Sequence, residues 1–323
     1  MIREWLAQKG WNWPEEHTPG PDDTDKSEGA DLLLPKAGPI RSQPAERFFT
    51  PAALRRAWLA IKRAGGGAGV DGVSLAQFEK SLDTELEKLR DELVRGVYRP
   101  RPLRQVLVPK GDGGLRPLAI WALRDRIAQR AVYEILAPSF ESIFLPVSFG
   151  FRPGLGVQDA VAQVARHRDE NLRWVVDGDI EQCFDSIDRR RLFKLTAHRV
   201  QDRLLLGYVR GWLEADILNS ADGVPRKAGA SQGSALSPLL ANIYLHEFDR
   251  ALTGKKLALV RYADDFVICC RRKADAEAAL QTTESALASL GLALNRHKSR
   301  IVHLDAGLGW LGYFFVRQEC YRV

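Results

Sequence analysis

The most informative stretch of the sequence is Leu257-Ala-Leu-Val-Arg-Tyr-Ala-Asp-Asp-Phe-Val-Ile-Cys-Cys270, in which two apolar runs flank two consecutive aspartates. The runs predict two buried strands, and Ala263-Asp264-Asp265 predicts the hairpin turn between them. An Asp-Asp pair is also common in an ordinary surface turn. Here, however, the apolar flanks place two like charges at the edge of a core, where their repulsion is costly. A divalent cation would relieve that repulsion, and hard oxygen ligands select Mg²⁺.

A third carboxylate turns this hairpin into a candidate metal site. Asp179 follows the apolar residues 174–176, and a strand there is expected to pair with the hairpin and bring Asp179 toward Asp264. Three carboxylates on adjacent strands can hold two metal ions roughly 3.5–4 Å apart. Asp177 and Asp185 are the competing acids of this segment, and we expect them at the surface or behind the site.

The elements around these acids follow a β-α-β-β-α-β order. The expected strands are residues 173–180, 257–262, 266–270 and 299–304, and the expected helices start at residue 188 and span 237–252 and 274–290. This order matches the split βαβ plan, so the fold class is α+β. In the first half, the pattern predicts helices over 51–64, 75–93 and 123–136, and a hairpin formed by strands 104–109 and 115–120.

Composition excludes several classes of protein. The chain has 323 residues, is 45% hydrophobic and 27% charged, and has no run of 18 apolar residues. These values exclude wholesale disorder, and they argue against a membrane span or a secretory signal. The four cysteines show no CxxC spacing and no zinc-type pairing with histidine, so we expect reduced thiols and a cytoplasmic protein without structural zinc.

Charge is distributed unevenly along the chain. The net charge is +6, but residues 1–46 carry five basic and nine acidic side chains, whereas the remaining 277 carry 42 and 32. The first 46 residues are also rich in proline, glycine and aspartate, which is typical of an extension or linker. The more basic body suggests a polyanionic partner.

The segment Gly67-Ala-Gly-Val-Asp-Gly72 fits the GxGxxG pattern of dinucleotide-binding proteins. That fold needs a strand before the glycines and a helix that opens at them. Because a basic helical segment precedes these glycines, we interpret them as a loop.

Taken together, the motifs resemble those of a reverse transcriptase of the bacterial group II intron-like lineage. Its blocks occur in order between about residues 65 and 316. They are residues 67–72, 108–118 (Val-Pro-Lys-Gly-Asp-Gly-Gly-Leu-Arg-Pro-Leu), 148–154 (Ser-Phe-Gly-Phe-Arg-Pro-Gly), 177–185 (Asp-Gly-Asp-Ile-Glu-Gln-Cys-Phe-Asp), 231–245 (Ser-Gln-Gly-Ser-Ala-Leu-Ser-Pro-Leu-Leu-Ala-Asn-Ile-Tyr-Leu), 262–265 (Tyr-Ala-Asp-Asp), 291–295 with Lys298, and 311–313 (Leu-Gly-Tyr).

The resemblance implies a role for each matching position. Asp179, Asp264 and Asp265 would be the catalytic ligands of two Mg²⁺ ions, for which Mn²⁺ can substitute, with the Ile180 carbonyl as a further ligand. The remaining positions would contact nucleotide or template. Lys110 and Arg116 would bind the triphosphate, Phe184 would act at the sugar as a gate against the ribose 2′-hydroxyl, and Gln232 would contact the nucleotide and the template base. Lys298 would protonate the leaving pyrophosphate as a general acid, and Arg152 would contact the template backbone.

Simpler interpretations exist for several of these residues. Lys110 and Arg116 also suit a solvated basic hairpin. Phe184 is an aromatic residue that follows a strand, a position typical of core residues. Lys298 also suits an ordinary surface cation.

The resemblance further implies a right-hand polymerase fold with fingers over 47–172 and a palm over 173–323, the palm carrying a helical insertion at about 188–230. The family continues past Leu-Gly-Tyr into a helical thumb, whereas this chain ends ten residues after Tyr313. We therefore expect a protein or a structured RNA to hold the primer–template duplex in place of the thumb.

The leading functional hypothesis is an RNA-directed DNA polymerase that adds dNTPs to a primer on an RNA template. Its setting would be a bacterial RNA-dependent system, namely CRISPR spacer acquisition, phage (antiviral) defence or intron-like mobility. Two alternatives remain at this point: an RNA-binding maturase without synthesis, and a template-independent or protein-primed polymerase. The three aspartates argue against the maturase, because a pure binding protein has no reason to bring them together.

Overall fold

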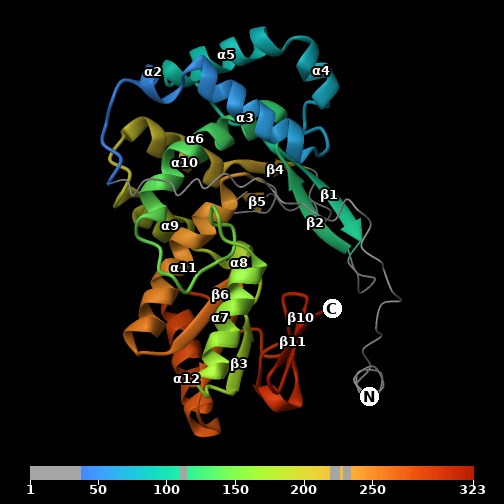
Figure 1. The fold of residues 1–323 in the computed structure, drawn as a ribbon. Helices are drawn as coiled ribbons and strands as arrows, with labels where there is room; N and C mark the ends of the chain where they lie inside the picture. Colours follow the sequence, from blue (N-terminus) through green and yellow to red (C-terminus); the bar gives the residue numbers. More distant parts are fainter. Residues whose placement is uncertain (1–37, 110–114, 219–225, 228–233) are drawn as a thin grey trace.

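The computed structural model describes residues 38–109, 115–218, 226–227 and 234–323, and these ranges combine helices with mainly antiparallel sheets (Figure 1). The expected α+β class is therefore confirmed. The described helices are α2 (Ala45–Phe48), α3 (Pro51–Ala64), α4 (Leu75–Lys80), α5 (Leu82–Val94), α6 (Leu123–Glu141), α7 (Val157–Asp169), α8 (Cys183–Ser186), α9 (Arg189–Ala197), α10 (Arg203–Glu214), α11 (Ser237–Gly254), α12 (Lys273–Ser289) and the 3-10 helix η1 (Leu304–Ala306). The described strands are β1 (Leu103–Pro109), β2 (Leu115–Ile120), β3 (Trp174–Asp179), β4 (Asp216–Leu218), β5 (Arg226–Lys227), β6 (Ala258–Tyr262), β7 (Asp265–Cys270), β8 (Arg300–His303), β9 (Leu308–Trp310), β10 (Tyr313–Val316) and β11 (Glu319–Arg322).

The central sheet has the order β6-β7-β3-β8. The expected pairing of the Asp179 strand with the hairpin is confirmed, because β3 and β7 run antiparallel with Asp179 opposite Asp265. In the hairpin, Tyr262 pairs with Asp265. The turn therefore contains two residues, Ala263 and Asp264, instead of the three expected, and Ala263 adopts a left-handed φ of 59°.

Side chains of the central sheet alternate between two cores, as the period of a strand requires. Val176 and Ile268 belong to the larger core, on the side covered by α11 and α12. Val175 and Val267 belong to a smaller core on the opposite face, which α7 and the strands β9 and β10 complete. Because both faces are covered, the middle of β6 and β7 consists of buried residues that are apolar, and the fully buried Arg261 in β6 is the exception.

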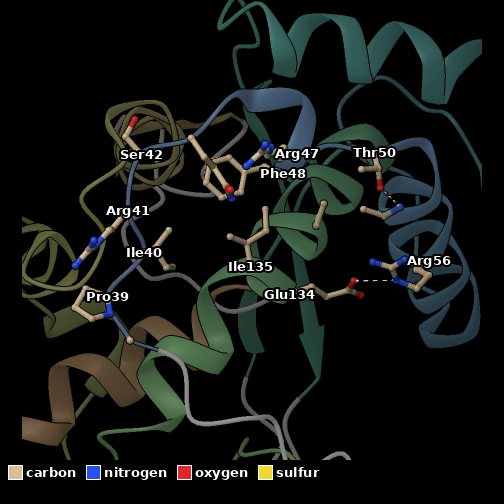
Figure 2. Close-up of a pocket in the computed structure, with 14 residues that line it drawn as sticks. Pro39, Ile40, Arg41, Ser42, Arg47, Phe48, Thr50, Arg56, Glu134 and Ile135 are labelled. Carbon is tan, nitrogen blue, oxygen red and sulfur yellow. Dashed lines mark hydrogen bonds and ion pairs between the residues drawn. The ribbon is translucent and has the colours of Figure 1, made fainter.

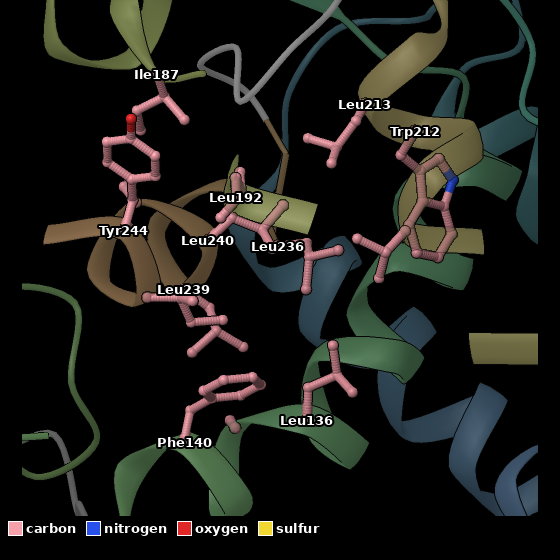
Figure 3. Packing of buried hydrophobic residues seen from close by; sticks show 14 of the residues in the cluster. Leu136, Phe140, Ile187, Leu192, Trp212, Leu213, Leu236, Leu239, Leu240 and Tyr244 are labelled. Atoms are coloured by element: carbon pink, nitrogen blue, oxygen red, sulfur yellow. The ribbon is translucent and has the colours of Figure 1, made fainter. Parts of the chain in front are cut away.

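The larger core extends from the central sheet to the helices α6, α9 and α10 (Figure 3). Leu136 and Phe140 of α6 pack in the same cluster as Leu192 of α9, Trp212 of α10 and Leu239 of α11. Burying a side chain of this size contributes about 1.5–3 kcal/mol. The cluster therefore ties the upper helices to the sheet that carries the aspartates.

The helix boundaries correct two expectations from the sequence. The helix expected over 75–93 is two helices, α4 and α5, separated at Ser81, whose ψ of 27° is not helical. The helix expected to end at residue 136 continues to Glu141 and contains Pro138 in its last turns. Burial of Phe140 beyond the proline favours this continuation despite the missing N–H donor. By contrast, α3 begins after Thr50 as expected, and the Thr50 Oγ1 accepts a hydrogen bond from the Ala53 N–H at 3.1 Å.

Further strands flank this framework. Strands β1 and β2 form the expected hairpin, which extends to the right of the upper helices in Figure 1. After η1, β9, β10 and β11 form a small antiparallel sheet that the sequence did not predict. Within the described ranges, none of the helices combines the length and apolarity needed to cross a membrane.

Candidate active site

Three aspartates meet at the end of the central sheet. Asp179 is the last residue of β3, Asp265 is the first residue of β7 directly opposite it, and Asp264 lies in the adjoining turn. The local sequence explains this placement, because the apolar strands fix the register and the two-residue turn places Asp264 beside them. The predicted convergence of the three residues is therefore observed, whereas their role as metal ligands stays a prediction.

The electrostatics show that these acids are poorly compensated by the protein itself. Burial, followed by repulsion from Asp264, Asp179 and Asp177, raises the pKa of Asp265 to about 6, although the residue as a whole is exposed. Burial and the negative charge of Asp179 also raise the pKa of Asp264. Such a cluster of oxygen donors with excess negative charge is chemically suited to a hard divalent cation.

The Asp179 side chain is held by the segment that follows α12. The Asn295 Nδ2 donates to the Asp179 Oδ2 at 2.8 Å, and the exposed Lys298 Nζ lies 3.6 Å from the same oxygen. The backbone is fixed as well, because the Asp179 N–H donates to the Ser299 Oγ at 3.1 Å and Ile180 forms a bridge with Leu294. The sequence assigned no role to Asn295 or Ser299, although Asn295 ends the 291–295 block and Ser299 follows Lys298.

The arrangement of the three aspartates does not by itself amount to a complete metal site. Among the residues that the structure describes, no group of three His, Cys, Asp or Glu side chains is arranged as a metal site. The raised pKa values of Asp264 and Asp265 nonetheless fit a cation, because burial and the neighbouring carboxylates raise both values despite the nearby Lys298.

A buried arginine lies immediately behind the aspartates. The Arg261 guanidinium donates to both carboxylate oxygens of Asp249 at 2.6 Å, to the Asn242 Oδ1 at 3.0 Å and to the Ser148 Oγ at 2.8 Å. It also donates to the Ala263 carbonyl, in the turn itself, at 2.8 Å. This network links β6, α11 and the 148–154 loop to the residue that precedes Asp264.

Two glycines allow close approaches around the aspartates. A Cβ on Gly178 would lie 2.2 Å from the Phe266 ring, and a Cβ on Gly150 would lie 2.4 Å from the Ala263 nitrogen. Only a hydrogen fits at either position. The glycine between the two acids of β3 and the glycine of the 148–154 loop therefore follow from packing.

Phe184 lies close to the aspartates, as its proposed role requires. Phe184 and Asp264 line the same small cavity, together with Phe151, Ala263 and Cys183. Phe184 is half-buried against the larger core, whereas Phe151 is 52% exposed. The core interpretation and the gate interpretation of Phe184 are therefore compatible. Phe151 is a neighbour that the sequence did not identify.

The predicted nucleotide-binding residues fall largely outside the described part of the chain. Lys110 and Gln232 lie outside the described residues, and Arg116 is described only as a backbone position in β2, opposite Val108. Their contact with nucleotide stays a prediction.

Arg152 has a different environment from the one expected. Its side chain is 9% exposed and forms an ion pair with Glu141, and its Nη1 donates to the carbonyls of Leu145 at 2.8 Å and Ser148 at 2.6 Å. These internal partners favour a structural role, holding the 148–154 loop against α6, over the predicted contact with template.

Asp177 and Asp185 lie outside the cluster, as expected. Asp177 forms an ion pair with the Arg300 Nε at 3.1 Å, and burial raises its pKa. Asp185 is exposed on α8.

A separate cavity of about 770 Å³ lies between residues 38–50 and the helices α3 and α6 (Figure 2). Arg41, Arg47 and Arg56 contribute to its lining, and Arg56 forms an ion pair with Glu134 at 3.6 Å. No candidate site residue lines this cavity, so the aspartates form a distinct site.

Comparison with known proteins agrees with this geometry. A family model described as reverse transcriptase (RNA-dependent DNA polymerase) matches residues 108–315, which include all three aspartates. The chain belongs to the reverse transcriptase family. This reverse transcriptase is 36% identical over 290 residues to protein YkfC of Escherichia coli (strain K12), a match that covers 78% of this chain and 76% of YkfC.

Other relatives of this reverse transcriptase are longer. It is 34% identical over 196 residues to the group II intron-encoded protein LtrA of Lactococcus lactis subsp. cremoris, covering 60% of this chain and 33% of LtrA. The chain thus spans about a third of that relative. A solved telomerase from Candida albicans, bound to a fragment of telomeric RNA, superposes with a TM-score of 0.54 at 15% identity and covers 71% of this chain and 47% of the telomerase. This likeness shows a shared fold.

Proposed function

We propose that this reverse transcriptase uses Asp179, Asp264 and Asp265 to catalyse RNA-directed DNA synthesis. In this reaction the 3′-oxygen of a primer attacks the α-phosphate of a dNTP, a new phosphodiester bond forms, and the bond to the leaving pyrophosphate breaks. The observation that carries the proposal is the direct pairing of Asp179 with Asp265 beside Asp264. Phosphoryl transfer depends mainly on positioning and charge stabilisation, which such a cluster supplies.

Two Mg²⁺ ions would be the cofactor, with Mn²⁺ as a substitute. The ligands would be the three carboxylates and the Ile180 carbonyl. When bound, the ions supply charge compensation for the attacking and leaving oxygens. The protein holds the ligands in place from behind: Asn295 orients the Asp179 carboxylate, and Arg261 fixes the turn that carries Asp264.

The remaining predicted residues complete the nucleotide site. Lys110, which follows β1 in the sequence, and Arg116 of β2 would bind the triphosphate, and Gln232 would pack near the nucleotide and the template base. Phe184 would exclude a ribose 2′-hydroxyl, a role supported by the cavity that it shares with Asp264. Lys298 would protonate the pyrophosphate, and its Nζ, 3.6 Å from the Asp179 Oδ2, lies close enough to the aspartates for that role.

The partners follow from the reaction. The substrates are an RNA template, a DNA primer and dNTPs, and we further propose a protein or structured RNA that helps to hold the duplex. The identity with LtrA supports an RNA-dependent system of the group II intron type. CRISPR spacer acquisition and antiviral defence are the other settings that such enzymes suit.

The test is primer extension on RNA with Mg²⁺. We expect Asp264→Asn to abolish dNTP incorporation, because the cation loses a charged ligand. Asp185→Asn is the matched control, since it removes an exposed aspartate near the site. Substantial synthesis by Asp264→Asn would refute the proposal. Equal incorporation with and without template would instead indicate a template-independent transferase.

A further inference from the structure

Four of the seven residues that line a pocket between α9 and α10 are cationic. The pocket has a volume of about 330 Å³, and Arg189, Arg190, Lys194 and Arg210 contribute to its lining. Glu214 is the single carboxylate among its lining residues. None of the residues of this pocket belongs to the proposed catalytic site.

The cations of this pocket form no ion pairs with the carboxylates of the described residues, Glu214 included. Within those residues, none of the four lies within 4 Å of a carboxylate. Arg190 and Lys194 are four residues apart on α9, a spacing at which like charges repel and weaken a helix. An anion bound between them would relieve that repulsion.

The pocket also contains an aromatic surface. The half-buried Phe193 ring lies under the Arg210 guanidinium, whose carbon is 4.4 Å from the ring centroid. The Arg189 Nη1 reaches the Leu213 carbonyl at 3.4 Å, so one of its donors is used at the end of α10. Leu213 and Phe193 make the apolar part of the lining, and the cations surround it.

We propose that this pocket binds single-stranded RNA. Cations that follow a phosphate backbone, combined with an aromatic side chain on which a base can stack, are the features with which proteins bind unpaired strands. The inference rests on the proposed function in one respect: during RNA-directed synthesis the product DNA is paired, so the unpaired strand is the template RNA.

Binding without synthesis provides the test. The probes are a fluorescein-labelled oligouridine and a blunt RNA–DNA duplex, measured by anisotropy without dNTPs over a series of salt concentrations. We expect Arg190→Glu/Lys194→Glu to weaken oligouridine binding at least about tenfold, and to lower the slope of log K against log salt by about 0.7 for each phosphate that the variant no longer neutralises. Binding of the blunt duplex should be unchanged.

Two further variants control the experiment. Arg271→Glu/Lys273→Glu reverses the same number of exposed charges at the start of α12 and should leave binding of both probes unchanged. Phe193→Leu keeps an apolar side chain but removes the stacking ring, and should weaken oligouridine binding at least about fivefold. This milder variant still tests RNA binding by the pocket if the charge-reversal variants fail to fold.

Several results would overturn the proposal: unchanged oligouridine binding in the α9 variants, an equal loss in the α12 control, or an equal loss with the blunt duplex. Because no nucleotide is added, these results are independent of whether Asp264→Asn abolishes synthesis. A chain that fails in primer extension can therefore still bind RNA through this pocket, and an active chain can fail this test.

Discussion

Arg261 and Asp249 form a two-pronged ion pair in which both side chains are almost completely buried, with Nε–Oδ1 and Nη2–Oδ2 distances of 2.6 Å. Asp249 lies on α11 and Arg261 on β6, so the pair joins a helix to the hairpin of the site. The same guanidinium donates to the Ala263 carbonyl. The position of the turn therefore depends on a charge that has no access to water.

Removing either partner of this pair should be strongly destabilising. Asp249→Asn and Arg261→Met each leave a buried group without its counter-charge, and we expect a loss of roughly 3–5 kcal/mol in the free energy of unfolding, measured with urea. The double variant Arg261→Met/Asp249→Leu should lose less than the sum of the single variants. Arg272→Ala, which breaks an exposed arginine–aspartate pair, is the control and should have little effect. Fully additive losses would contradict the coupling.

Asp265→Asn should stabilise the metal-free protein at alkaline pH. The pKa of Asp265 in the folded chain, about 6, lies above its usual value of 3.8. Ionisation of Asp265 therefore disfavours folding, fully above about pH 6 and not at all below about pH 4. We expect Asp265→Asn to raise the Tm in EDTA at about pH 8 and to leave it unchanged at about pH 4. A lower Tm at both pH values would show that repulsion at this residue is unimportant.

Mg²⁺ should stabilise the wild-type protein through the same carboxylate. Protons and Mg²⁺ compete for Asp265, so we expect the Tm gain caused by Mg²⁺ to shrink as the pH falls through about 6. Asp265→Asn should show a much smaller gain at every pH. Titration of the metal in thermal unfolding experiments measures both effects, and a gain independent of pH would argue that the cation binds elsewhere.

Phe184→Val should relax discrimination against ribonucleotides. A smaller side chain in the cavity shared with Asp264 leaves space for a 2′-hydroxyl. We expect the preference for dNTP over rNTP, expressed as a ratio of kcat/KM values, to fall about tenfold or more. Tyr321→Val, which truncates an aromatic side chain on β11, is the control for loss of a ring outside the site. An unchanged ratio in Phe184→Val would exclude the gate.

Asn295→Ala should weaken the use of Mg²⁺. Without its hydrogen bond from Asn295, the Asp179 carboxylate keeps its contact with Lys298. We expect a roughly 10- to 100-fold loss in apparent Mg²⁺ affinity or initial rate, measured by metal titration of primer extension. Arg296→Ala, at the exposed neighbouring position, should behave like the wild type. Equal losses in Asn295→Ala and Arg296→Ala would show that the loss comes from disturbing this segment and not from removing the Asn295 amide.

The sequence predicted the central sheet well because its signals are local. Apolar runs around Asp264 and before Asp179 predicted the strands, and the order of elements predicted their pairing. Helix starts such as Thr50 were also predictable, because a capping side chain bonds within its own turn.

The features that the sequence missed depend on distant partners. Arg261 stands in an apolar strand, and nothing near it in the sequence indicates that Asp249 and Ser148 surround it. The internal contacts of Arg152 come from α6 and from carbonyls of its own loop, which no side-chain pattern reveals. The sequence did not indicate the break at Ser81, because the helical spacing of the leucines continues from α4 into α5.

The contact between Gly178 and Phe266 has a consequence for the aspartates beside them. Since a Cβ on Gly178 would meet the Phe266 ring at 2.2 Å, a larger residue forces the ring or the strand to shift, directly beside the pair Asp179 and Asp265. The placement of Asp179 opposite Asp265 thus relies on an apolar contact in the neighbouring pair as well as on the pairing of the strands. Hydrocarbon packing of this kind responds little to salt or pH, so this contact constrains the two strands in the same way whether the carboxylates are charged or neutral.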